Sequence, residues 1–292
     1  MAVERFEVPD ARSGPYGVTA GPDGAVWFTL VHAGEVGRLA ADGTVTTYGL
    51  DAPESGPSVI TAGPDGALWF TRMRDHRIGR IGTDGTARSF ALPGEGPGPY
   101  GIAAGPDGAL WFTELNADRI GRITVDGEVT EYPLPVTGGF PSMITAGPDG
   151  ALWFTLNQAD AVGRITVDGE VTVHPLPTTG TAPVGIARGG DGALWYVGIG
   201  AGLVGRITVD GEVTEYPLPD RAARPHAVTA GRDGRVWFTE WGAGRIGSFD
   251  AGGAYRGHEL PVAGAEPHGI AVGADGAVYA ALEIGEIVRV TG

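Results

Sequence analysis

The sequence predicts an all-β protein, a seven-bladed β-propeller with four strands in each blade. Three observations lead to this prediction. One motif recurs seven times, the copies keep a constant spacing of 42 residues, and turn signals divide each copy into four short strands. Since all seven copies are alike, we expect residues 1–292 to form a single domain.

The repeat is clearest in the segment GPDGALWFT, which occurs at residues 63–71, 105–113 and 147–155. Its aromatic position recurs at Trp27, Trp69, Trp111, Trp153, Trp195, Trp237 and Tyr279. An upstream proline recurs in the same register at Pro15, Pro57, Pro99, Pro141, Pro183, Pro225 and Pro267. Such regular self-similarity is the signature of a repeat architecture.

The third copy illustrates the strands of one blade, which we expect at residues 101–104, 109–113, 119–124 and 128–134. Gly108 and Gly127 close Asp-Gly turns, where glycine supplies a positive φ. Four strands in about 40 residues is the size of a propeller blade. A solenoid would need atypical capping repeats at both ends, and the sequence contains none.

The two ends of the chain indicate that the ring is closed. The last copy stops shortly after its third strand, whereas residues 5–9 (RFEVP) match the fourth strand of another copy, residues 131–135 (EYPLP). An N-terminal strand that completes the last blade would remove an exposed sheet edge. Since a closed ring has no edge that demands a partner, we expect a monomer.

Charge and composition exclude several classes of protein. The formal net charge of −15 disfavours binding to nucleic acid or to anionic membranes. The chain has no cysteine, and so no disulfide, zinc–thiolate site or cysteine nucleophile. The N-terminal residues MAVERFEVPD lack the apolar run of a signal peptide, and no stretch is apolar enough to span a membrane. We therefore expect a cytoplasmic protein.

Residues that match the consensus are expected to hold the blades together. We assign the tryptophans to the core between blades and the Asp-Gly pairs to turns. The arginines of the GRI segments are expected to make structural hydrogen bonds or to pack between strands; they are Arg38, Arg80, Arg122, Arg164 and Arg206. Function is expected where the copies differ on one face of the disc.

Two sets of variable positions fall on the same face of a four-stranded meander. One set flanks the repeat proline: the preceding residues are Gly14, Gly56, Gly98, Phe140, Ala182, Arg224 and Glu266. The following residues are Tyr16, Ser58, Tyr100, Ser142, Val184, His226 and His268. Because residues two apart in an extended chain point to the same side, Glu266 should share a face with His268.

The second set lies four residues after the aromatic position: Val31, Met73, Leu115, Asn157, Ile199, Trp241 and Glu283. Blade seven again carries a carboxylate, so we predict a cluster of His226, Glu266, His268 and Glu283 near the axis. The remaining histidines are expected on the surface without partners; they are His32, His76, His174 and His258.

The residue types in this cluster suggest acid–base chemistry assisted by a hard cation. Mg²⁺ commonly takes one or two carboxylates and keeps several waters, which suits Glu266 and Glu283. A neighbouring histidine can act as a general base near neutral pH, and a base with a Lewis acid suits proton removal next to a carbonyl. Trp241 and Tyr16 would add apolar walls for a ligand.

Three segments resemble the virginiamycin B lyases, or streptogramin lyases: RPHAVTAG at 224–231, WFTEWGAGRIG at 237–247 and AEPHGI at 265–270. This resemblance implies magnesium-dependent opening of cyclic depsipeptide antibiotics by elimination at an ester bond. It implies that His268 is the proton acceptor, Glu266 and Glu283 bind Mg²⁺, and His226 contacts substrate. Tyr279 departs from the family, which tends to have Trp-Phe there; this departure affects the expected packing more than the chemistry.

Two other functions remain open at this point. The first is a metal-dependent lactonase or esterase related to the six-bladed calcium propellers, although seven copies and two acidic candidates disfavour it. The second is a non-enzymatic binding or scaffold propeller, which the regularity of the copies would suit, because one fold hosts many functions.

Overall fold

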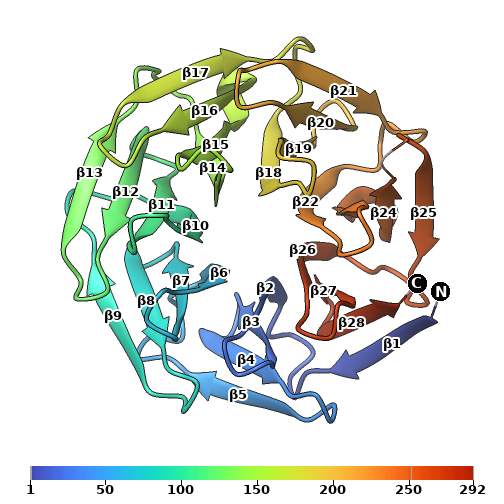
Figure 1. Cartoon of the computed structure of the whole chain (residues 1–292). Helices are drawn as coiled ribbons and strands as arrows, with labels where there is room; N and C mark the ends of the chain where they lie inside the picture. The colour runs from blue at the N-terminus through green and yellow to red at the C-terminus, as the bar shows by residue number, and fades with distance from the viewer. Residues whose placement is uncertain (1, 251, 292) are drawn as a thin grey trace.

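The computed structural model describes residues 2–250 and 252–291 (Figure 1). Within these residues the chain forms seven four-stranded antiparallel sheets arranged in a ring around a central channel. The predicted seven-bladed β-propeller is therefore confirmed. Among the described residues, no helix has the length and apolar character that a membrane crossing requires.

Within each blade, the four strands are ordered from the channel to the outer rim. The innermost strands are β2 (Pro15–Ala20), β6 (Pro57–Ala62), β10 (Pro99–Ala104), β14 (Pro141–Ala146), β18 (Pro183–Arg188), β22 (Pro225–Ala230) and β26 (Pro267–Val272). The second strands are β3 (Val26–Leu30), β7 (Leu68–Arg72), β11 (Leu110–Glu114), β15 (Leu152–Leu156), β19 (Leu194–Gly198), β23 (Val236–Glu240) and β27 (Val278–Leu282).

The third strands are β4 (Glu35–Leu39), β8 (Arg77–Ile81), β12 (Arg119–Ile123), β16 (Ala161–Ile165), β20 (Leu203–Ile207), β24 (Arg245–Phe249) and β28 (Glu286–Thr291). The outermost strands are β5 (Val45–Gly49), β9 (Ala87–Ala91), β13 (Val129–Pro133), β17 (Val171–Pro175), β21 (Val213–Pro217), β25 (Tyr255–Glu259) and β1 (Ala2–Glu7). Short 3₁₀ helices, η1 (Asn157–Ala159) and η2 (Trp241–Ala243), follow β15 and β23. We number the blades from β2–β5 (one) to β26–β28 with β1 (seven).

The innermost strands begin earlier than predicted. In blade three the strand starts at Pro99, two residues before the predicted Gly101, and its pairing with β11 is irregular between Pro99 and Ile102. Neighbouring blades approach closely here: a Cβ added to Gly101 would lie 2.4 Å from the carbonyl oxygen of Ser142. Glycine is therefore required at this position by contact with the next blade.

Pairing of β1 with β28 closes the ring, as the sequence predicts (Figure 1). Phe6 faces Ile287, and the Arg5 guanidinium donates to the Glu286 carboxylate, with Nε and Oε2 2.9 Å apart. The strand spans Ala2–Glu7 and so ends two residues before Pro9, at the position equivalent to Pro133, where the outermost strand of blade three also ends.

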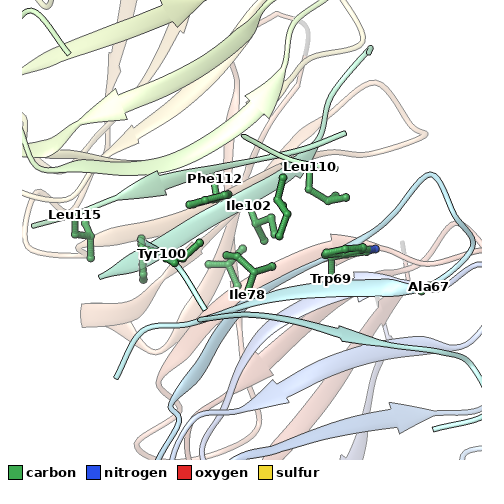
Figure 2. Packing of buried hydrophobic residues seen from close by; sticks show 11 residues of the cluster. Ala67, Trp69, Ile78, Tyr100, Ile102, Leu110, Phe112 and Leu115 are labelled. Carbon is green, nitrogen blue, oxygen red and sulfur yellow. The ribbon is translucent and has the colours of Figure 1, made fainter. Parts of the chain in front are cut away.

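The repeated tryptophans pack between blades, as predicted. Figure 2 shows Trp69 of blade two near Ile102 and Leu110 of blade three, and all three side chains are fully or almost fully buried. The same positions in the neighbouring blades are also closed to solvent, at Trp27, Trp111 and Trp153. Dense packing of this kind joins each blade to the next.

The repeated arginines are structural, as predicted. In blade one the Asp23 carboxylate accepts hydrogen bonds from the Trp27 indole, at 3.0 Å, and from Arg38 Nε, at 2.7 Å. Blade seven keeps this arrangement because Tyr279 donates its hydroxyl to Asp275 at 3.2 Å. Tyr279, together with Phe6 and Gly43, also lines a cavity of about 400 Å³ between blades seven and one.

Blade three contains an acidic pair that lies away from the channel. Glu114, at the end of β11, is fully buried, and neither of its carboxyl oxygens has a hydrogen-bond partner among the described residues. Arg119 binds the neighbouring Glu131 instead, with NH1 and Oε2 3.0 Å apart. Burial and the negative charge of Glu131 raise the pKa of Glu114 to about 8.

This pair predicts a pH-dependent stability. Because the folded-state pKa of Glu114 lies above its unfolded value, its contribution is fully present below about pH 4.5 and is lost as the pH rises through 8. We expect Glu114→Gln to reduce this loss, measured as the free energy of urea unfolding between pH 5 and 9. Glu128→Gln, on the exposed surface of the same blade, is the control. Parallel pH curves for wild type and Glu114→Gln would contradict the expectation.

Candidate functional site

The predicted cluster lies at one mouth of the channel, on blades six and seven. His226 and His268 each follow the proline that starts an innermost strand, β22 or β26. Their rings are nearly perpendicular, with centroids 4.9 Å apart. Glu283 follows β27, and its Oε2 lies 2.5 Å from Nε2 of His268. The structure thus places these three side chains next to one another.

Glu266 lies opposite Glu283 in the register of blade seven. Pro267 pairs with Leu282, and one step beyond it the Glu283 N–H donates to the Glu266 carbonyl at 3.1 Å. Residues directly opposite in an antiparallel pair have Cβ atoms about 4.5–5.5 Å apart. The two carboxylates therefore start from adjacent positions, and the Glu266 side chain is exposed at the mouth.

The backbone before the proline differs in blade seven. At this position Gly14, Gly56 and Gly98 have positive φ, and so do three larger residues, Phe140, Ala182 and Arg224, with φ of 54°, 45° and 49°. Glu266 is not among the described residues that adopt this left-handed conformation. The connection into blade seven therefore directs its carboxylate differently from the equivalent side chains.

His32 is a member of the cluster that the sequence interpretation missed. Its Nε2 lies 2.8 Å from Oε1 of Glu283, so Glu283 stands between His32 of blade one and His268 of blade seven. The prediction that His32 has no partner is therefore wrong. The sequence did predict that blade seven, which carries Glu283, lies beside blade one, which carries His32. The repeat register does not show which loop residues of the two blades come into contact.

The other three histidines also have partners, contrary to the prediction. His174 stacks on Trp153 and His258 on Trp237, with ring centroids 5.4 and 5.0 Å apart. They occupy the place of the tyrosines and phenylalanine that stack on tryptophan in other blades, as Tyr48 does on Trp27. His76 accepts a hydrogen bond from the Gly98 N–H at 3.3 Å. These histidines serve the scaffold.

Tyr16 forms one wall of the site. Its ring stacks on His268 with centroids 4.6 Å apart, and its hydroxyl lies 2.7 Å from the hydroxyl of Tyr100, which reaches across the channel from blade three. The same hydroxyl is 3.5 Å from Nε2 of His226. Tyr16 therefore contacts both histidines, and Tyr100 was not singled out from the sequence.

Trp241 begins η2 and lies on the blade-six side of His268, with ring centroids 6.1 Å apart. The Arg224 guanidinium lies over the indole, 5.5 Å from its centroid. The indole N–H is buried without a hydrogen-bond partner among the described residues. Trp241 thus adds an aromatic ring beside His268.

Burial keeps the two histidines neutral at physiological pH. Desolvation, together with a smaller effect of the neighbouring His268, lowers the pKa of His226 to about 3. Burial also lowers the pKa of His268, although Glu283 acts in the opposite direction. Burial raises the pKa of Tyr16 well above its ordinary value, so its hydroxyl stays protonated. A neutral imidazole can accept a proton, and a protonated hydroxyl can donate a hydrogen bond.

Below this cluster, the innermost strands enclose a channel cavity of about 280 Å³. Tyr16, Tyr100 and His226 line it together with small and aliphatic residues of the same strands. The larger cavity at Tyr279 is lined by turns of the opposite face and contains no histidine. We therefore place the candidate site at the channel mouth.

Two carboxylates on adjacent backbone positions fit a magnesium ion that keeps most of its waters. Among the described residues no group of three or more histidine, aspartate and glutamate side chains is arranged to hold a metal. In the arrangement described here, each oxygen of Glu283 contacts a histidine. Because no third such side chain completes a metal site among the described residues, a cation at this place would rely on Glu266, Glu283 and water.

The low pKa of His226 gives a prediction for the free protein. We expect its imidazole signals in ¹H–¹⁵N NMR spectra, recorded with EDTA present, to stay those of a neutral ring from pH 5 to 8. The His226→Ala spectrum identifies the signals. A titration midpoint for His226 near 6.5 would show that the ring is solvated and would contradict the burial described above.

The fold and the site define a class: a seven-bladed propeller with a histidine–carboxylate cluster at one mouth of its channel. The model of the virginiamycin B lyase family matches residues 1–290. The chain therefore belongs to the virginiamycin B lyase family, as the sequence resemblance implied.

Individual relatives agree with this assignment. A streptogramin B lyase structure is 43% identical, with a TM-score of 0.96, over 99% of this chain and 96% of that chain. A catalytically inactive histidine-to-alanine variant of virginiamycin B lyase from Staphylococcus aureus, crystallised with quinupristin, is 42% identical with a TM-score of 0.95, covering 99% and 98%. Virginiamycin B lyase from Saccharopolyspora erythraea is 60% identical over 52 residues, which are 18% of this chain and 17% of that protein.

Proposed function

We propose that this protein is a carbon–oxygen lyase that linearises type B streptogramins, which are cyclic depsipeptide antibiotics, and so confers resistance to them. The observation that carries the proposal is a neutral His268 beside Glu266 and Glu283 at the channel mouth. A relative of 42% identity that lacks one histidine is catalytically inactive and was crystallised with quinupristin, which supports a histidine as the key group.

His268 is the general base in this proposal. Its Nδ1 is buried, whereas Nε2 faces the partly exposed Glu283, so Nε2 is the nitrogen that a ligand at the mouth can reach. In the reactive tautomer Nε2 is unprotonated, which requires the Glu283 carboxylate to turn from Nε2 toward the cation, and Nε2 then accepts the α-proton of the esterified threonine. The electron pair of the broken C–H bond forms the Cα–Cβ double bond, and the Cβ–O bond breaks to release a carboxylate.

Glu266 and Glu283 are the proposed ligands of Mg²⁺. A bound magnesium ion would act as a Lewis acid that polarises the carbonyl next to the α-carbon and makes its proton more acidic. Loss of either carboxylate would remove half of the protein ligands. The exposure of Glu266 leaves room for the waters that magnesium retains.

Three further residues are proposed to hold the substrate. His226, neutral and beside His268, can hydrogen-bond a peptide group without bringing a second positive charge close to the base. Tyr16 stacks on His268 and fixes the plane of its ring, while Trp241 adds an aromatic ring on the other side of His268. Aromatic walls with few polar groups suit a ring-containing peptide.

The decisive measurement is the mass of the product. Incubation with a type B streptogramin should give a linear peptide of unchanged mass, because elimination neither adds nor removes atoms, and EDTA should suppress its formation. A product heavier by one water would mean hydrolysis, as in a lactonase or esterase. Binding without any product, with Mg²⁺ supplied, would favour a binding propeller instead.

Replacement of the base tests its role directly. We expect His268→Ala to lower kcat by about 10²–10⁴-fold, since general bases contribute that much. The matched control is His174→Tyr, which replaces a histidine by the residue that blade three carries at this position, Tyr132. An activity of His268→Ala within about threefold of the control would exclude a base role.

A further inference from the structure

A single buried hydroxyl connects the two site histidines through their backbones. Thr239, in β23, is fully buried; its Oγ1 accepts a hydrogen bond from the Ala227 N–H and donates one to the His268 carbonyl, both at 2.9 Å. Ala227 directly follows His226. The hydroxyl therefore links the strand that carries His226, in blade six, with the strand that carries His268, in blade seven.

We call this arrangement a threonine bridge: a buried threonine that accepts from the innermost strand of its own blade and donates to a carbonyl of the next blade. Four other blades contain one, and the donating residues are Thr29, Thr71, Thr113 and Thr155. Their acceptors are the carbonyls of Ser58, Tyr100, Ser142 and Val184. Blade five has Val197 at this position and blade seven has Ala281.

The missing bridges flank the site. Val197 cannot tie blade five to blade six, and Ala281 cannot tie blade seven to blade one, because neither side chain has a hydroxyl. Blades six and seven are therefore joined to each other by Thr239 but to neither neighbour by this interaction. The ring closes at two joints without the bridge, so the hydroxyl of Thr239 is not a general requirement of the fold.

We propose that Thr239 is a positioning residue for the lyase reaction, which fixes His268 relative to His226. It touches no reacting atom. It holds the carbonyl of His268 and the N–H next to His226 at hydrogen-bond distance, and so sets the separation and angle between the two imidazoles. Small displacements of a catalytic group can cost up to about 10²-fold in rate.

The test uses Thr239→Val, which keeps the size of the side chain and introduces the residue that blade five already has. The matched control is Thr155→Val, which removes the same two hydrogen bonds, from the Met143 N–H and to the Val184 carbonyl, in blade four. We expect both variants to lose similar thermal stability. Thr239→Val should lower kcat about 10- to 100-fold with little change in KM, and Thr155→Val should change neither by more than about twofold.

Two further measurements separate positioning from general damage. Thr239→Ser restores the hydroxyl and should recover most of kcat; if Thr239→Val does not fold, Thr239→Ala, which matches blade seven, takes its place. Equal kcat values for Thr239→Val and Thr155→Val, or no recovery with serine, would overturn the proposal.

The inference rests on the proposed function, and one readout does not need turnover. The imidazole NMR signals of His226 and His268 should shift in Thr239→Val and stay unchanged in Thr155→Val. If wild type does not convert the antibiotic but these signals shift, the lyase proposal fails while the positioning role of Thr239 stands. Unchanged signals in Thr239→Val would overturn the positioning role.

Discussion

The pairing of β1 with β28 is the constraint on which the site depends, because it brings blade seven beside blade one. The contacts of His32 with Glu283 and of Tyr16 with His268 both cross this joint. The strands that make the closure contribute no side chain to the cluster. They tie blade seven to the segment that leads into blade one, whose innermost strand β2 packs against β26. Strand pairing at the outer rim thus helps to fix the positions of side chains near the channel axis.

At the axis, packing decides the charge state of the histidines. The innermost strands surround His226 and His268 with aromatic and small residues, and this burial favours the neutral imidazoles. The perpendicular contact between the two rings would be repulsive if both were protonated. Carboxylates remain at the outer edge of the mouth, where Glu266 is exposed to solvent. The site therefore separates an inner part, which holds the neutral histidines, from an outer part, where the Glu266 carboxylate reaches solvent.

Much of this could be predicted from sequence, because a constant repeat fixes which residues occupy equivalent places. The neighbouring places of His226 and His268 followed from their equivalent positions after the repeat proline, and Glu283 from its departure from the other copies. His32 and Tyr100 were missed because their contacts cross the joint or the channel, and the register of one blade carries no information on such distances. Thr239 was not predicted as a site residue because it matches the repeat consensus. It differs from the other repeated threonines only in that its hydroxyl contacts the backbone beside His226 and the carbonyl of His268.

The closing ion pair joins Arg5 to Glu286, 281 residues apart in sequence. During synthesis on the ribosome, the first strand must wait unpaired until nearly all of the protein has been made, while blades one to six can assemble in order. An unpaired strand is a target for wrong partners, and six near-identical neighbours offer them. Because His268, Glu266 and Glu283 of blade seven are translated last, the cluster can form only at the end of folding. A prematurely terminated chain would carry most of the scaffold but would lack His268 and both glutamates of the cluster.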